Sequence, residues 1–165
     1  MRIGFVLLFS AIAAVVAGCG GGGATAAGAP ASASATLAAK PATISTRNGQ
    51  LGTFLVDGKG RTLYLFEKDT GRRSRCSGAC AQAWPPVITR GKPVAKGRAK
   101  ASLLSTSRRA NGSRQVTYGG HPLYRFAPDT APGQTKGQGV DGFGALWWVV
   151  GRSGNAITSS ASPGY

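Results

Sequence analysis

The feature that most constrains this chain is an internal repeat. The phrase TLYLFEKDT, at residues 62–70, returns as PLYRFAPDT at residues 122–130. Each phrase follows a Ser-Thr pair, an Asn-Gly pair, a β-prone run and a glycine-rich turn, in the same order. Repeated units of this kind bury a shared hydrophobic face only by packing against one another. We therefore expect two similar units packed as one small domain.

Each unit is expected to be an antiparallel β-meander. The Asn-Gly pairs at residues 48–49 and 111–112 stand between extended runs, where they favour a tight hairpin with positive φ at both turn residues. Glycine-rich turns at residues 57–60 and 119–120 then lead into the two Leu-Tyr-x-Phe runs. The pattern predicts three strands in each copy.

A fourth strand is expected to close each copy, over residues 86–89 in the first and 145–150 in the second. Helix signals are slight. The run SGACAQAW, around Cys80, favours one short helical turn that Pro85 and Pro86 end. The predicted fold class is mainly β, with at most a short helical turn near Cys80.

Alternation along the repeated phrase indicates which face is buried. In an extended run, Tyr64 and Phe66 point to one side, and Leu63 and Leu65 point to the other. The second copy keeps both aromatics but has Arg125 in place of Leu65, and arginine is rarely buried unless it is paired. We expect the Tyr/Phe face to form the core and the Leu65 face to lie nearer solvent.

The N-terminal residues have the features of an export signal with lipid attachment. Residues 1–18 join a basic start to an apolar run that is too short to span a bilayer comfortably. They lead into Val-Ala-Gly-Cys, which resembles the lipobox of bacterial lipoproteins and implies cleavage before Cys19 and lipidation of this residue. The alternative is an ordinary secretory signal with a chance cysteine.

Composition predicts the domain boundaries. Residues 19–42 are almost entirely Gly, Ala, Ser, Thr and Pro, which predicts a flexible tether. The β-rich domain is expected over residues 43–151, with its two repeats at about 44–90 and 103–150. Residues 152–165 are again small and polar and are expected to form a flexible tail.

Three cysteines in an exported chain leave one odd thiol. If Cys19 carries lipid, Cys76 and Cys80 are expected to form a disulfide in an oxidising compartment. The alternative is a redox or metal site that uses both thiols and the single histidine, His121. Redox pairs normally use CxxC, and two thiols are an incomplete metal site. We therefore predict no metal and no cofactor.

The chain is strongly basic, with a formal net charge of +15. Such an excess favours association with anionic envelope polymers or lipid head groups. The interpretation that the sequence favours over such association is a solvated basic surface without a partner. An exported chain with no recognisable nucleic-acid module argues against specific nucleic-acid binding, and the sequence identifies no protein partner.

The repeat also supplies candidate ligand contacts. They are the repeated acids and tyrosines with the single histidine: Asp69, Asp129, Tyr64, Tyr124 and His121. The alternative for each Asp-Thr pair is that it caps a turn through side-chain to backbone hydrogen bonds. Because no nucleophile or acid–base pair is recognisable, we predict no catalytic residues and no enzymatic activity.

Two motifs in the repeated phrases are similar to those of a known protein family. The sequences YLFEKD (residues 64–69) and YRFAPD (residues 124–129) fit a Tyr-x-aromatic-x-x-Asp motif, and GQGVDGFGALW follows at residues 137–147. The chain resembles the bacterial lipoprotein family known as the secreted repeat of unknown function. This resemblance implies a lipoprotein anchored at the extracytoplasmic face of the cell membrane, and it implies no particular activity.

Two functions are therefore expected from the sequence. The first is a lipid-anchored, non-catalytic binding or structural module of the cell envelope. The alternative is a redox or metal-handling envelope protein that uses Cys76, Cys80 and His121.

Overall fold

The computed structural model describes residues 40–158 of the chain. The expected signal peptide, Cys19 and most of the expected tether lie outside the described residues, as do residues 159–165. Within residues 40–158, no helix has the length and apolar character needed to cross a membrane.

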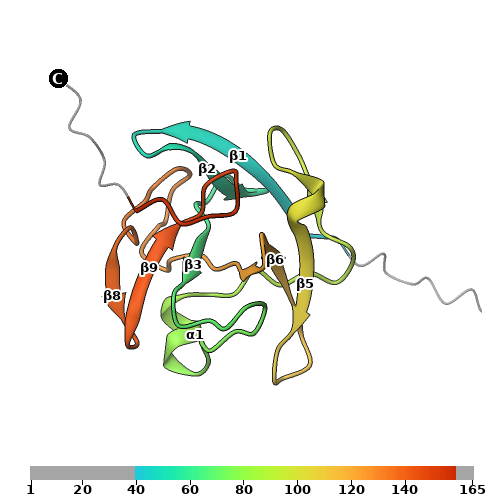
Figure 1. Cartoon of the computed structure of the whole chain (residues 1–165), viewed down its shortest axis with the longest axis vertical. Helices are drawn as coiled ribbons and strands as arrows, with labels where there is room; N and C mark the ends of the chain where they lie inside the picture. The colour runs from blue at the N-terminus through green and yellow to red at the C-terminus, as the bar shows by residue number, and fades with distance from the viewer. Residues whose placement is uncertain (1–39, 159–165) are drawn as a thin grey trace, which may run out of the picture. The chain divides into compact units, whose positions relative to one another are not determined.

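Three small sheets make up the domain (Figure 1). The first sheet has the strand order β2-β1-β4. It contains β1 (Thr43–Gly49), β2 (Gly52–Asp57) and β4 (Val94–Ala95). Strands β1 and β2 form an antiparallel hairpin, whereas β4 runs parallel to β1. The short strand β4 thus brings the connection between the two copies alongside the first strand.

The other two sheets are antiparallel throughout. The second sheet is a meander of the second copy, made of β5 (Leu104–Arg108), β6 (Arg114–Tyr118) and β7 (His121–Pro122). The third sheet has the order β3-β9-β8 and takes strands from both copies. Its strands are β3 (Tyr64–Phe66), β8 (Val140–Gly142) and β9 (Ala145–Val149).

Helical structure is short, as predicted. The helix α1 (Ala79–Ala83) carries Cys80 and ends at Trp84, whose N–H donates to the Cys80 carbonyl at 2.8 Å. Two prolines follow Trp84 and prevent the helix from continuing. A single 3₁₀ turn, η1 (Ala101–Leu103), precedes β5. The mainly β fold with a helical turn near Cys80 is confirmed.

The expectation that each copy is closed by its own last strand is wrong. Strand β9 belongs to the second copy but pairs with β3 of the first. Just beyond β9, Val150 joins a ring of three backbone hydrogen bonds. Leu55 N–H donates to Val150 O at 2.8 Å, Val150 N–H to Leu63 O at 3.0 Å, and Leu63 N–H to Leu55 O at 3.0 Å. The second copy therefore closes the first.

Residues 86–89, where we expected the last strand of the first copy, form isolated β-bridges and no strand, but they make the equivalent ring in the second copy. Val116 N–H donates to Val87 O at 2.8 Å, Val87 N–H to Leu123 O at 2.9 Å, and Leu123 N–H to Val116 O at 3.0 Å. Pro86 and Ile88, on either side of Val87, also bridge to the second copy. The two copies thus exchange their closing segments: Val87 of the first copy closes the second, and Val150 of the second copy closes the first. A strand's residue pattern specifies its two faces but not its partner strand, so the sequence did not reveal this exchange.

Equivalent residues of the two copies meet at the centre of the domain. Tyr64 N–H donates to Tyr124 O at 2.9 Å, and Tyr124 N–H donates to Tyr64 O at 3.0 Å. The rings of Trp84 and Trp147 stack with their centroids 3.9 Å apart and their planes 4° apart. These reciprocal contacts define a local twofold relation between the copies.

The Tyr/Phe face is core, as predicted. Tyr64, Phe66 and Tyr124 are fully buried in one hydrophobic cluster together with Trp84 and Trp147. Edge-to-face and stacked ring contacts of this kind add to the free energy gained from apolar burial. We call this group the aromatic cluster.

The expectation that the Leu65 face lies nearer solvent is wrong. Leu65 is only 4% exposed and belongs to a second, aliphatic cluster with Leu63 and Leu123. The exchanged strands cover this face, so both sides of the repeated phrase are buried. Arg125, at the position of Leu65, is accommodated by an ion pair with Asp57.

The two Asn-Gly pairs differ in their position relative to the hairpin turns: the first lies within β1, and the second lies in a loop. In β1, Asn48 pairs with Thr53 and Gly49 pairs with Gly52, so the first hairpin turns at residues 50–51, later than predicted. The Thr53 hydroxyl donates to Asn48 Oδ1 at 2.7 Å and so stabilises this register. In the second copy the Asn-Gly pair does lie in the loop between β5 and β6, where only its glycine has positive φ.

The expected C-terminal tail begins later than residue 152. Ile157 N–H donates to Val149 O at 2.9 Å, and Gln138 Nε2 donates to Ile157 O at 2.6 Å. Ile157 also packs against the aromatic cluster. Residues 152–158 therefore fold back along β9 and extend the domain past the predicted boundary.

Candidate functional site

The repeated motif is satisfied between the two copies and not within either one. Tyr64 Oη donates to Asp129 Oδ2 at 2.5 Å, and Tyr124 Oη donates to Asp69 Oδ2 at 2.8 Å. The tyrosine of each motif is bound by the aspartate of the other. The structure thus brings together four of the five candidate ligand contacts as two pairs, of which Tyr64–Asp129 is buried and Tyr124–Asp69 is partly buried.

The second oxygen of each aspartate also has a partner. Arg75 N–H donates to Asp69 Oδ1 at 2.7 Å, and Lys136 N–H donates to Asp129 Oδ1 at 3.0 Å. Each aspartate N–H donates to the carbonyl of the aromatic residue three positions earlier, at 3.1 Å in both copies. Both aspartates therefore stand in turns and use both carboxylate oxygens inside the fold. Ligand contact by these residues stays a prediction.

Burial sets the acid–base properties of both pairs. It raises the pKa of the Asp69 and Asp129 carboxyls, although hydrogen bonds and nearby cations oppose the shift. Burial also raises the pKa of the Tyr64 and Tyr124 hydroxyls, and the adjacent carboxylates add to the effect. Both hydroxyls consequently keep their protons far above neutral pH and remain hydrogen-bond donors.

Cys76 and Cys80 form the predicted disulfide. Both cysteines are buried, and Arg109 Nη2 donates to Cys76 O at 2.5 Å. His121 lies in β7, where it pairs with Tyr118. No group of three or more His, Cys, Asp or Glu side chains in the described part of the chain is placed to hold a metal ion. The redox and metal hypothesis therefore gains no ligand set from these residues.

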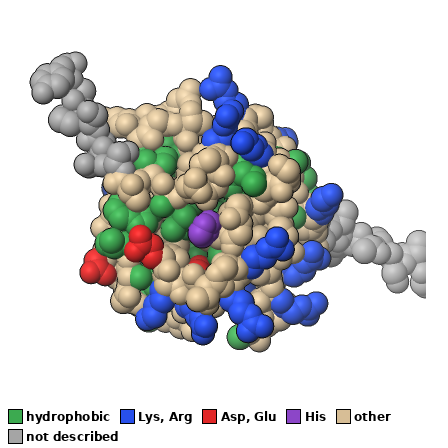
Figure 2. All heavy atoms as spheres, viewed as in Figure 1, with side chains coloured by type: hydrophobic (Ala, Val, Ile, Leu, Met, Phe, Trp, Pro, Cys, Tyr) green, Lys and Arg blue, Asp and Glu red, His purple; other side chains and the backbone are tan. Residues whose placement is uncertain are grey.

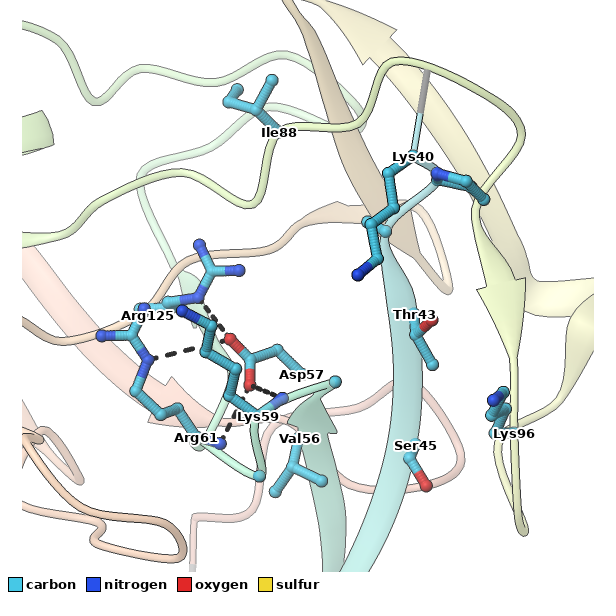
Figure 3. Close-up of a pocket in the computed structure, with 14 residues that line it drawn as sticks. Lys40, Thr43, Ser45, Val56, Asp57, Lys59, Arg61, Ile88, Lys96 and Arg125 are labelled. Carbon is cyan, nitrogen blue, oxygen red and sulfur yellow. Dashed lines mark hydrogen bonds and ion pairs between the residues drawn. The ribbon is translucent and has the colours of Figure 1, made fainter. Parts of the chain in front are cut away.

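A pocket of about 920 Å³ lies beside the turn that follows β2 (Figure 3). We call it the Asp57 pocket. Its charged lining residues are one acid and five cations: Asp57, Lys40, Lys59, Arg61, Lys96 and Arg125. Thr43 and Ser45 of β1 add hydroxyl groups, and Val56 and Ile88 add apolar surface. The pocket is therefore basic in charge, and its surface is about as apolar as it is polar.

Asp57 organises this pocket from a buried position. Its Oδ1 accepts hydrogen bonds from Lys59 N–H at 2.8 Å and Arg61 N–H at 3.0 Å, which cap the turn. Its Oδ2 accepts a hydrogen bond from Arg125 Nε at 2.6 Å. Burial opposes ionisation of Asp57, but the hydrogen bonds from Arg125, Arg61 and Lys59 outweigh it and lower the pKa of this carboxyl. Asp57 is therefore ionised at neutral pH.

A family model described as a secreted repeat of unknown function matches the chain twice, over residues 45–88 and 105–151. The chain belongs to this family. No curated protein and no solved structure matches it. The two secreted-repeat segments correspond to the two copies, and each ends on the strand that closes the other copy, at Val87 and Val150.

The Tyr–Asp pairs of this secreted-repeat protein use positions that occur in both segments, whereas the Asp57 pocket does not. Asp57 and Arg61 come from the first segment and Arg125 from the second, where the first has Leu65. Sequence reasoning missed this pocket. Its one signal was the difference between Leu65 and Arg125, which we interpreted as solvent exposure and not as a pairing partner for a distant acid.

Proposed function

We propose that this secreted-repeat protein is a non-catalytic binding module of the cell envelope. In this proposal a lipid on Cys19 holds the chain at the extracytoplasmic face of a membrane, and the domain binds anionic envelope polymers or lipid head groups. The lipobox-like Val-Ala-Gly-Cys supports the anchor, since two or more acyl chains give stable attachment. The charge of the domain supports the anionic partner.

The observation that carries the proposal is the way the domain uses its acids. All five Asp and Glu residues of the chain lie within residues 40–158, with every Lys and Arg except Arg2. Four of these acids accept hydrogen bonds inside the domain, namely Asp57, Glu67, Asp69 and Asp129. Among the described residues, only Arg61 and Arg125 form ion pairs. Most of the positive charge is thus left for external partners.

The charge is also unevenly distributed over the surface. On the face drawn in Figure 2, Lys and Arg side chains gather mainly on the side that carries β5 in Figure 1, whereas the Asp and Glu side chains lie on the side of β8 and β9. A surface dominated by one sign of charge attracts polyanions, and added salt weakens this attraction.

Retention on immobilised polyanions tests the binding part of the proposal. The full-length protein, purified in a non-ionic detergent, is applied to linear polyphosphate, to polygalacturonate and to neutral dextran. We expect retention on both polyanions at low salt, where the Debye length is about 30 Å, and release at high salt, where it is about 3 Å. Dextran should not retain it. If neither polyanion retained the protein at low salt, the proposal would be contradicted.

Mass spectrometry tests the anchor separately. The protein is isolated from a bacterial host that lipidates exported proteins. We expect residues 1–18 to be absent and Cys19 to carry acyl chains, and Cys19→Ser should remove the modification and the partitioning into a detergent phase. An exported protein with an unmodified Cys19 would contradict the anchor alone, because binding to polyanions depends on the domain.

A further inference from the structure

The Asp57 pocket breaks the symmetry of the repeat. The two hydrogen-bonded rings place Leu55 of the first copy in the role of Val116 in the second. Two positions further along β2 and β6, Asp57 therefore corresponds to Tyr118. Both members of the Asp57–Arg125 pair thus lack a counterpart in the other copy. The Tyr–Asp pair thus occurs twice in the domain, whereas this ion pair occurs once.

Asp57 holds two guanidinium groups at the edge of the pocket. The Nε of Arg125 is 2.6 Å from Asp57 Oδ2, and the Nε of Arg61 is 3.8 Å from the same oxygen. The Arg61 Nε is buried and has no hydrogen-bond partner among the described residues. Asp57 has only 4% of its side chain exposed, against 21% for Arg125 and 36% for Arg61. The acid is therefore enclosed, while both arginines are more exposed and line the pocket.

The other cations face the same space. In Figure 3 the guanidinium of Arg125 and the ammonium end of Lys40 point into the opening between Asp57 and Ile88, and the side chain of Lys59 lies across Asp57 beside the arginines. One carboxylate cannot neutralise these cations together, and its oxygens already accept hydrogen bonds from Arg125 and from the turn N–H groups. The lining of the pocket therefore carries a net positive charge, which favours an anionic ligand.

We propose that the Asp57 pocket binds the phosphate group of a polyol or sugar phosphate, either free or as part of a polymer. This inference rests on the proposed function and assigns it a site. A carboxylate presents two oxygens in one plane, which one arginine fork satisfies, whereas phosphate accepts donors from several directions. Arg125, Arg61, Lys59 and Lys40 line the pocket and offer several charged donors, with Lys40 across the opening from Arg125.

The size and walls of the pocket fit more than a bare phosphate ion. A volume of about 920 Å³ leaves room for an attached carbon skeleton. Thr43 on β1 offers a hydroxyl to a polyol or sugar, and Ile88, which is 41% exposed, offers an apolar surface. Asp57 does not contact the ligand in this arrangement. It is a positioning residue that orients Arg61 and Arg125.

Calorimetric titration of the full-length protein in a non-ionic detergent tests the site. The probes are sn-glycerol 3-phosphate, inorganic phosphate and galacturonate, with a short-chain phosphatidylglycerol as the lipid probe. We expect saturable binding of both water-soluble phosphates, tighter for the ester, and binding of galacturonate weaker by about tenfold, since one carboxylate uses fewer of the charged donors. Binding of the lipid without either water-soluble phosphate would overturn the inference, because recognition would then belong to the acyl chains.

Two variants localise the binding. Lys59→Gln removes an exposed ammonium group but keeps the backbone N–H that caps Asp57, and Arg125→Gln removes the guanidinium. Each should weaken glycerol phosphate binding roughly tenfold or more, the loss expected for a charged hydrogen bond. Arg72→Gln, an exposed cation that does not line the pocket, should leave binding unchanged. The melting transition of each variant shows whether it is folded.

Two results would overturn the inference. One is the absence of saturable phosphate binding by the unchanged protein. The other is binding that Lys59→Gln and Arg125→Gln do not weaken while both variants remain folded. If polyphosphate still retains the protein in either case, the proposed function stands and only this site is wrong. If polyphosphate and polygalacturonate both fail to retain it, the proposed function fails as well.

Discussion

Tyr64 and Tyr124 hydrogen-bond to each other through their backbones in both directions, and each donates its hydroxyl to the aspartate of the other copy. The Tyr-x-aromatic-x-x-Asp motif is therefore completed only when two copies pack together. Asp129 in the second copy satisfies a tyrosine of the first, and Asp69 does the reverse. Each copy supplies the missing partner of the other.

Tyr64→Phe is predicted to destabilise the domain. It keeps the ring in the aromatic cluster but leaves the buried Asp129 carboxylate without its tyrosine donor, which costs about 1–3 kcal/mol of unfolding free energy. Urea denaturation measures the loss. Asp129→Asn, alone and combined with Tyr64→Phe, completes a double-mutant cycle. Additive effects in this cycle would show that the hydroxyl and the carboxylate do not interact.

Stability is predicted to fall as pH rises above the ordinary pKa of tyrosine. The folded-state pKa of Tyr64 and of Tyr124 is raised by burial and by the adjacent carboxylates. Above the ordinary value the unfolded chain loses these protons while the folded chain keeps them, so the unfolded state is favoured. Absorbance of tyrosinate against pH, followed together with circular dichroism, should show these residues ionising only as the domain unfolds. Ionisation of every tyrosine before unfolding would contradict this account.

Neither copy is predicted to fold alone. Val87 completes the hydrogen-bonded ring of the second copy, and Val150 completes that of the first. Fragments 1–100 and 101–165 should each lack a cooperative thermal transition, because each leaves a strand edge and an apolar face exposed. Mixing the fragments should restore β-sheet circular dichroism. A cooperative transition in either fragment by itself would show that the exchanged strand is dispensable.

Arg125→Leu is predicted to cost more stability than the double change Asp57→Asn with Arg125→Leu. The single variant leaves a buried carboxylate without its nearer cation, a change that destabilises proteins by roughly 3 kcal/mol when the pair is fully buried. The cost is smaller here, because Arg125 is partly exposed and Arg61 stays 3.8 Å from Asp57. In the double variant the side-chain oxygen of the introduced asparagine can still accept the hydrogen bonds that cap the turn. Urea denaturation of both variants measures the difference.

This difference should shrink in acid. The Arg125→Leu variant loses the side-chain hydrogen bond and the charge of Arg125 that lower the pKa of Asp57, while burial, which raises this pKa, remains. The buried charge is therefore neutralised as pH falls, and the penalty of the single variant is relieved. Repeating the denaturation at acidic pH checks the sign. A difference between the two variants that does not change with pH would contradict the assignment of the effect to the Asp57 charge.

Removal of the disulfide is predicted to lower stability modestly. The bond between Cys76 and Cys80 closes a very short loop, for which the chain-entropy model gives about 2 kcal/mol. Thermal denaturation of Cys76→Ala with Cys80→Ala, compared with the unchanged protein under reducing and oxidising conditions, measures the effect. Equal stability of the unchanged protein with and without reductant would show that the bond contributes nothing.

The repeat, the mainly β class, the buried Tyr/Phe face and the disulfide were all determined by the sequence. Each depends on local chemistry: alternation along a strand, glycine in turns, or an even number of remaining thiols. The placement of Asp69 and Asp129 in turns was recognisable for the same reason.

Strand pairing was decided only by the tertiary structure. The apolar sequences of residues 86–89 and 145–150 fit a strand edge in either copy equally well, and only packing of the whole domain selects the exchanged partners. This exchange buries the Leu65 face and brings Arg125 beside Asp57, which is distant in sequence. The Asp57 pocket follows from that approach of two distant residues, which no local pattern records.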